Sequence, residues 1–166
     1  MKRAVGLIIL TDVPNMERVA VLQVRGTYNP EKMAQESYPG ACQVTCHGGL
    51  EEGESEMDAL FREAKEELGQ ALQTIVKSKK EYLQELSRLS DDKKEMATYG
   101  LLLTDCSFLT NLAWGPASGG MKLVTAKTGI LDLATFSKEE GVTDTRHVAM
   151  FPDEAEAVKK AFEVFA

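Results

Sequence analysis

Cysteine is scarce in this chain of 166 residues, which has only three: Cys42, Cys46 and Cys106. An odd number without paired spacing argues against a disulfide framework and indicates a reducing compartment, so we expect a cytoplasmic location. Cys42, Cys46 and His47 stand close together in the sequence, but no second ligand pair with the usual zinc spacing accompanies them. A structural zinc site is therefore not expected.

The sequence also lacks any apolar run long enough to cross a bilayer, so no membrane partner is expected. The apolar residues 4–10, which follow Lys2 and Arg3, superficially resemble a signal peptide. This run is short, however, and it ends at Thr11 and Asp12 without a small-residue cleavage site. We interpret it as a buried strand.

The chain has fewer basic than acidic residues: 19 Lys and Arg against 26 Asp and Glu, which gives a formal net charge of −7. This charge repels the phosphate backbones of DNA and RNA and gives no electrostatic footprint for nucleic-acid binding. It does not exclude a small anionic ligand, provided that cations mediate the contact.

What the sequence does contain is an alternation of strand-like and helix-like segments, over a length that suits one domain, residues 1–166. Short apolar runs predict strands at 4–12, 18–26, 41–46, 98–105, 121–126 and 147–151, with a loop at 27–40. Helical periodicity predicts helices at 55–68, 70–90 and 153–165. The fold class is therefore α/β or α+β with a mixed sheet. The second helix looks like a helical insertion at about 70–95 that serves as a lid, a dimer face or packing.

The helix expected between Ser55 and Gly69 carries three carboxylates on one face. Ser55 predicts its N-cap and Gly69 a left-handed C-cap. Glu63, Glu66 and Glu67 stand at i, i+3 and i+4, where like charges cost about 0.2–0.5 kcal/mol per pair. Such a face is either simply solvated or gathered around a divalent cation. Mg²⁺ suits the second alternative, because it prefers carboxylate oxygens together with substrate phosphates.

The spacing around these carboxylates favours the cation. Gly48 is followed after five residues by Glu54 and after seven more by the run REAKEELG, residues 62–69. This pattern resembles the Nudix box, the loop–helix signature of Nudix hydrolases. The seven matching fixed positions are Gly48, Glu54, Arg62, Glu63, Glu66, Glu67 and Gly69. The resemblance covers residues 48–70, and Gln70 departs from it because the family usually has an aliphatic residue there.

The resemblance implies an α/β/α sandwich with a mixed β-sheet and a metal-dependent pyrophosphohydrolase. Its substrate would be a small nucleoside diphosphate derivative, whose diphosphate linkage is cleaved by water attacking phosphorus. The implied cofactor is Mg²⁺ or Mn²⁺, bound by Glu63, Glu66 and Glu67, with the carbonyl of Gly48 or its neighbour completing the site.

The resemblance also implies supporting roles around that site. Arg62 would hold Glu66 or a loop carboxylate in place, and Glu54 would do similar work where the loop meets the helix. Arg25, at the end of the second expected strand, stands where the family often keeps an arginine. It is a candidate for a substrate phosphate contact, with a surface charge as the alternative.

The general base is left open at this point. In some family members it is a box glutamate, for which Glu63 is the equivalent here. In others it is a glutamate on a distant loop, and Glu139 and Glu140 are the loop candidates in this chain. Both loop residues have the alternative interpretation of solvated carboxylates in a turn.

Two other functions occur on the same fold. A nucleotide-sensing domain that binds without cleaving commonly loses box glutamates. Isopentenyl-diphosphate isomerase has its catalytic cysteine immediately before the box glycine, where this chain has His47, with Cys46 one position earlier. The intact box favours the hydrolase. The sequence marks that would assign a substrate are missing, and the oligomeric state, including a homodimer, is left open.

Overall fold

The centre of the molecule is a seven-stranded mixed β-sheet in a structure, here a computed structural model, that describes all 166 residues. The main path has the order β5-β2-β1-β8-β7, while β6 pairs with β1 and β9 pairs with β2. Only β1 and β8 run parallel, and the other neighbours are antiparallel. The strands are β1 (Lys2–Asp12), β2 (Arg18–Arg25), β5 (Cys42–Gln43), β6 (Cys46–Gly49), β7 (Gln84–Ser90), β8 (Lys94–Asp105) and β9 (Ser118–Thr125).

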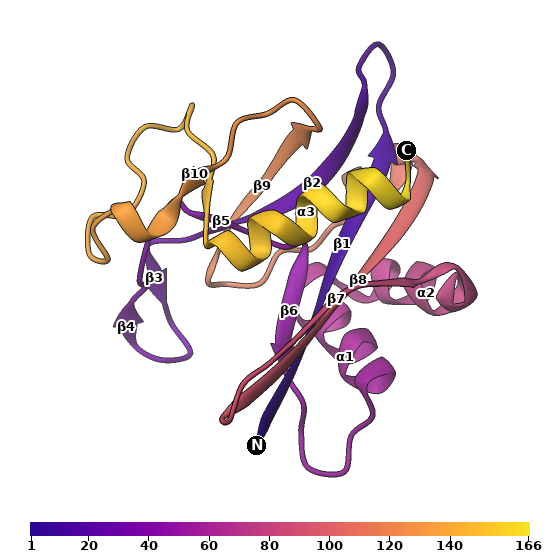
Figure 1. Ribbon diagram of the computed structural model, residues 1–166, viewed down its shortest axis with the longest axis horizontal. Helices are drawn as coiled ribbons and strands as arrows, with labels where there is room; N and C mark the ends of the chain where they lie inside the picture. The colour runs from indigo at the N-terminus through magenta and orange to yellow at the C-terminus, as the bar shows by residue number, and fades with distance from the viewer.

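Helices cover both faces of this sheet, as Figure 1 shows. Helices α1 (Glu56–Leu68) and α2 (Gln70–Ser78) lie on one face, and α3 (Pro152–Val164) crosses the other. The buried part of β1, residues 5–11, explains the arrangement, because successive side chains in a strand point to opposite faces. Leu7 and Ile9 join the apolar cluster under α1 and α2, while Ile8 and Leu10 join the cluster under α3. The expected α/β/α sandwich is therefore confirmed.

Three shorter pieces complete the chain. The segment expected to be a loop at 27–40 contains a small hairpin of β3 (Tyr28–Asn29) and β4 (Ala34–Gln35). Near the C-terminus, β10 (Leu131–Asp132) pairs in parallel with β11 (Ala149–Met150). The short 3₁₀ helices η1 (Lys80–Tyr82), η2 (Cys106–Asn111) and η3 (Leu133–Thr135) lie in the connections. No helix of the protein combines the length and the hydropathy that crossing a membrane requires.

The single helix predicted for residues 70–90 is wrong in its second half. Helix α2 ends at Ser78, and β7 forms an antiparallel edge strand beside β8. The turn between these strands is fixed by Asp91, whose side chain accepts hydrogen bonds from the backbone N–H groups of Lys93 and Lys94. The proposed helical insertion is thus a short helix followed by a β-hairpin.

An ionic cluster ties this hairpin to the start of α1. Arg88 on β7 donates two hydrogen bonds of 2.9 Å to the Glu56 carboxylate, and the Tyr99 hydroxyl donates a third at 2.8 Å. The Arg88 guanidinium lowers the pKa of Glu56 to about 2. Helix α1 is thereby fixed against β7 and β8, which contributes to the precise placement of its other end.

The ends of α1 follow the sequence prediction with one difference. Ser55 is the N-cap, and its hydroxyl accepts a hydrogen bond from the Asp58 backbone N–H at 3.1 Å. Gly69 ends the helix with a φ of +99°, but its ψ of 165° is not that of a left-handed cap. It is instead a sharp joint, because α2 begins at the very next residue, Gln70.

Candidate active site

A polar cleft with a volume of about 270 Å³ opens beside the second half of α1. Its walls come from β2, the strands β5 and β6, the turn of the β3–β4 hairpin and the segment 115–118 that leads into β9. The residues that line it are Gln23, Arg25, Glu31, Lys32, Glu36, Gln43, His47, Glu63, Glu66, Glu67 and residues 115–118. The three box glutamates singled out from the sequence therefore face one cleft.

Glu63 is the most buried of these carboxylates, with 9% of the residue exposed. Its side chain lies against Gly48 of β6, where a Cβ atom would come within 2.1 Å of the carboxyl group. Only glycine leaves this space free, which explains the pairing of Gly48 with Glu63 in the sequence pattern. Burial raises the pKa of Glu63, although the Arg62 guanidinium 2.7 Å away opposes the rise.

Glu67 lies one helical turn after Glu63 and is held by two donors. The side-chain amide of Gln23 donates to Oε1 at 3.0 Å, and the backbone N–H of His47 donates to Oε2 at 3.2 Å. Burial raises its pKa to about 7, and the negative charges of Glu63 and Glu66 add to the rise. A positive charge placed nearby would therefore stabilise the ionised form of the Glu67 carboxylate.

Glu66 is the most exposed of the three, since 56% of its side chain is accessible. Its only ion pair is with Arg62, at 3.3 Å. Glu63 is thus buried, Glu67 is half-buried and Glu66 is exposed, and all three line the cleft.

Arg62 connects the loop before α1 with the carboxylates on it. Its guanidinium donates two hydrogen bonds of 2.9 Å to Glu54, one of 2.8 Å to the Gly49 carbonyl and one of 2.7 Å to Glu63. The Arg62 guanidinium lowers the pKa of Glu54 to about 2, and the pKa of Arg62 is raised in turn. Arg62 and Glu54 thus join the loop to the helix, and neither lines the cleft.

Arg25 does line the cleft, and its guanidinium is firmly held. It donates to the Ser37 carbonyl at 2.8 Å, to the Ser37 hydroxyl at 3.1 Å and to Gln43 Oε1 at 3.1 Å, and Glu36 lies 3.4 Å away. The same Gln43 oxygen lies 3.0 Å from His47 Nε2. Burial lowers the pKa of His47 to about 4, with a smaller contribution from Arg25, so this imidazole is neutral at pH 7.

Apart from segment 115–118, six residues of the cleft were not predicted as site residues from the sequence: Gln23, Glu31, Lys32, Glu36, Gln43 and His47. A signal for Gln23 was available, because it stands two residues before Arg25 in the same strand and so shares its face. His47 immediately precedes Gly48. Lys32 and Gln43 reach the cleft only through the fold of the 27–43 segment, which carries no periodic pattern.

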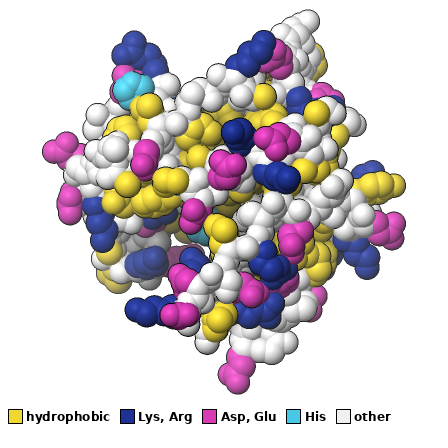
Figure 2. Space-filling view, in the orientation of Figure 1, with side chains coloured by type: hydrophobic (Ala, Val, Ile, Leu, Met, Phe, Trp, Pro, Cys, Tyr) yellow, Lys and Arg dark blue, Asp and Glu magenta, His cyan; other side chains and the backbone are white.

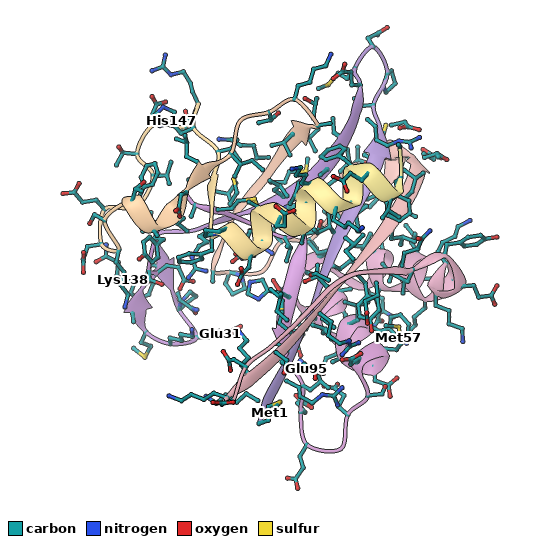
Figure 3. All side chains as sticks on the ribbon, viewed as in Figure 1. Met1, Glu31, Met57, Glu95, Lys138 and His147 are labelled. Atoms are coloured by element: carbon teal, nitrogen blue, oxygen red, sulfur yellow. The ribbon has the colours of Figure 1, made fainter.

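Glu139 and Glu140 do not reach the cleft. Both are exposed, and Glu139 accepts a hydrogen bond from the Ser137 hydroxyl at 3.2 Å. Their neighbour Lys138 lies at the margin of the molecule beside η3 (Figure 3). The structure therefore brings neither loop carboxylate to the box glutamates.

The cleft has the donor types that a hard divalent cation requires, namely several carboxylates and no thiolate. No group of three or more His, Cys, Asp or Glu side chains is arranged as a complete metal site, however. Glu66 pairs with Arg62, and Glu67 accepts from Gln23 and His47. Burial raises the pKa values of Glu63 and Glu67, and of these two only Glu63 has an ion pair, with Arg62, so a bound cation would offset the remaining negative charge.

Comparison with known proteins identifies similar structures but no similar sequences. No protein-family model matches the chain, and no curated protein matches it. Among solved structures, a MutT/nudix family protein from Enterococcus faecalis superimposes over 98% of this chain with a TM-score of 0.62 and 18% identity. The chain has the Nudix fold.

Two further solved structures share this fold. The NUDIX domain of Shewanella oneidensis NrtR, complexed with ADP ribose, has a TM-score of 0.60 and 12% identity, with 99% of this chain and 88% of that one covered. An Ap4A hydrolase from C. elegans has a TM-score of 0.56 and 15% identity, with 99% and 97% covered. The chain spans 61% of the length of the Enterococcus faecalis protein.

Proposed function

We propose that this protein is a metal-dependent pyrophosphohydrolase that cleaves a diphosphate linkage in a nucleoside diphosphate derivative by attack of water on phosphorus. The observation that carries the proposal is that Glu63, Glu66 and Glu67 open into one cleft that also contains the cations Arg25 and Lys32. The Nudix fold supports it, because a MutT/nudix family protein and an Ap4A hydrolase share that fold.

The residues present fit Mg²⁺ or Mn²⁺ as the cofactor. Glu63, Glu66 and Glu67 would hold it, together with a backbone carbonyl at or beside Gly48. When bound, the ion would polarise the phosphoryl oxygens and offset the negative charge that develops in the reaction. The chain would thus supply three carboxylates and one carbonyl oxygen as ligands, and the substrate phosphates would supply others.

Each neighbouring group has a role in preparing these carboxylates. Arg62 orients Glu63 and Glu66, and the hydrogen bonds from Gln23 and His47 fix the Glu67 carboxylate. Glu63 is our candidate general base, because its carboxylate lines the cleft, where it could reach an attacking water. Arg25 would contact a substrate phosphate.

Two alternatives have weaker support. The first alternative is a domain that binds nucleotides without cleaving them, and the NrtR domain complexed with ADP ribose has a similar fold. In that case the box carboxylates of this chain would take no part in catalysis. An isomerase would need a thiol at the cleft, but Cys46 is fully buried under α1, and burial raises its pKa well above the ordinary value. The three free cysteines are compatible with a reducing, cytoplasmic setting.

The proposal is tested by assaying nucleoside diphosphate derivatives with Mg²⁺, using the unmodified protein and the variants Glu63→Gln, Glu66→Gln and Glu67→Gln. Each variant should lose about 100-fold or more in kcat, because transition-state stabilisation by such groups is typically of that size. Glu163→Gln, an exposed carboxylate on α3, is the matched control and should be unchanged. Binding of nucleotides without turnover by the unmodified protein would favour the sensing domain instead.

A further inference from the structure

The candidate cleft contains no residue on which a nucleobase could stack well. Its lining has no Phe, Tyr or Trp, and its largest apolar side chain is Pro116. The one ring is the half-buried imidazole of His47, whose Nε2 is tied to Gln43 at 3.0 Å. A base held here would therefore lack the aromatic partner that contributes about 1–3 kcal/mol per base in stacked sites.

Aromatic residues that neighbour the cleft in sequence are engaged elsewhere. Tyr38 packs edge-to-face against Phe151, with ring centroids 5.2 Å apart. Trp114, immediately before the cleft segment 115–118, packs on the apolar cluster between β1 and α1. Tyr28 on β3 is 51% exposed but does not line the cleft. None of these aromatic side chains therefore lines the cleft.

The charge of the lining limits the number of phosphates that it can accept. Five carboxylates (Glu31, Glu36, Glu63, Glu66 and Glu67) stand against two cations, a difference of three negative charges. A diphosphate therefore needs bound cations to enter this lining, and every further phosphate adds negative charge that must also be neutralised. The part of the substrate beyond the diphosphate should therefore be uncharged.

Among the polar groups away from the box, Glu31 is the acceptor whose side chain has no partner, whereas Glu36 and the Gln43 oxygen already contact Arg25. Glu31, at the turn of the β3–β4 hairpin, has no ion pair, and its side chain extends from the hairpin in Figure 3. The Gln43 oxygen accepts from Arg25 and lies 3.0 Å from His47 Nε2, so it is occupied. A carboxylate without a partner, such as that of Glu31, is a suitable acceptor for hydroxyl groups. At about 270 Å³ the cleft is also smaller than the roughly 300–1,000 Å³ typical of sites that enclose a drug-sized ligand.

On the basis of the proposed function, we propose that the cleft recognises the substrate through a diphosphate and an attached sugar or polyol, and that it does not bind a nucleobase. Glu31 is assigned as a binding residue for hydroxyl groups of that sugar. A nucleoside diphosphate derivative would still be cleaved, with its base outside the cleft. Removal of the base would then have little effect on turnover.

The test compares ADP with ribose 5-diphosphate, which is the same molecule without adenine. With Mg²⁺, the two kcat/KM values should agree within about threefold. Stacking of the base would instead favour ADP by roughly 5- to 150-fold, and that result would overturn this inference while leaving the proposed function intact. If neither these compounds nor any other nucleotide is cleaved, the proposed function fails and this inference fails with it.

Two variants sharpen the comparison. Glu31→Gln should raise KM for ribose 5-diphosphate by roughly three- to tenfold at unchanged kcat, whereas the control Glu163→Gln should change neither constant. Tyr28→Ala should leave kcat/KM for ADP as it is. A fall for ADP alone in Tyr28→Ala would mean that the base stacks on the hairpin, which would contradict the inference.

Discussion

The Glu63 carboxyl group occupies the space in which a Cβ atom on Gly48 would lie, 2.1 Å from that position. These two residues come from a strand and a helix, and their contact fixes how deeply the first box carboxylate enters the cleft wall. The sequence spacing of the box thus has a direct steric meaning in this protein. It also gives the sharpest single substitution for testing the site.

Gly48→Ala should therefore displace Glu63 and reduce kcat by roughly tenfold to 100-fold. The added methyl group should cost about 1–3 kcal/mol of stability, as overpacking typically does. Gly129→Ala is the control, because nothing lies within 4 Å of a Cβ atom at that glycine. Steady-state kinetics and thermal unfolding measure both effects. Full activity in Gly48→Ala would show that the position of Glu63 is unimportant.

Arg62→Lys should not preserve activity. Arg62 makes a bidentate pair with Glu54 and also contacts Gly49 and Glu63, whereas a lysine offers one ammonium group without this planar fork. We expect a loss of roughly 10–100-fold in Mg²⁺ affinity, the usual size for residues that orient metal ligands. A titration of activity against Mg²⁺ concentration measures it. Equal Mg²⁺ dependence of the two proteins would contradict the positioning role.

The raised pKa of Glu67, about 7, predicts how the metal-free protein depends on pH. Because its folded pKa lies above the ordinary value of 4.5, its contribution to stability is present below pH 4.5 and is lost as the pH rises through 7. Glu67→Gln should therefore unfold at a higher temperature than the unmodified protein at pH 8, by about 2–4 °C for each kcal/mol gained.

Addition of Mg²⁺ should reverse that order, because only the unmodified protein keeps the full set of carboxylates. Differential scanning calorimetry at pH 5 and pH 8, with and without Mg²⁺, tests both statements. A Glu67→Gln variant that is less stable at pH 8 without metal would show that burial of this carboxylate is not costly.

Arg25→Ala should affect substrate binding more than turnover. We expect KM for a diphosphate substrate to rise about tenfold with kcat changed much less, because the arginine would contact a phosphate in both ground and transition states. The contacts to Ser37 and Gln43 are lost as well, so some destabilisation of the segment before β5 should accompany the change. An unchanged KM would assign Arg25 a purely structural role.

Local patterns predicted the mixed α/β class and the box helix, and the resemblance to the Nudix box implied the sandwich. The buried run of β1 reads as a strand, and Ser55 and Gly69 mark the ends of α1 correctly. The box glutamates could be placed on one helix face from their spacing alone. Their common cleft then follows from the packing of α1 against β6.

The errors have physical reasons. Leu72, Val76 and Leu86 are all buried and keep a helical spacing, yet Leu86 belongs to a strand whose partner β8 is supplied by a later part of the chain. The Asp91 turn was the local signal against one long helix. Gln23 and His47 contact Glu67 across more than 19 residues of sequence, which no periodicity can reveal.

Calorimetric titration with Mg²⁺ tests the central claim most directly, by comparing the unmodified protein with a variant in which Glu63, Glu66 and Glu67 are all glutamine. We predict Mg²⁺ uptake by the unmodified protein, strengthened by a diphosphate ligand, and none by the variant. Absence of Mg²⁺ and Mn²⁺ uptake by the unmodified protein, with or without such a ligand, would contradict the account.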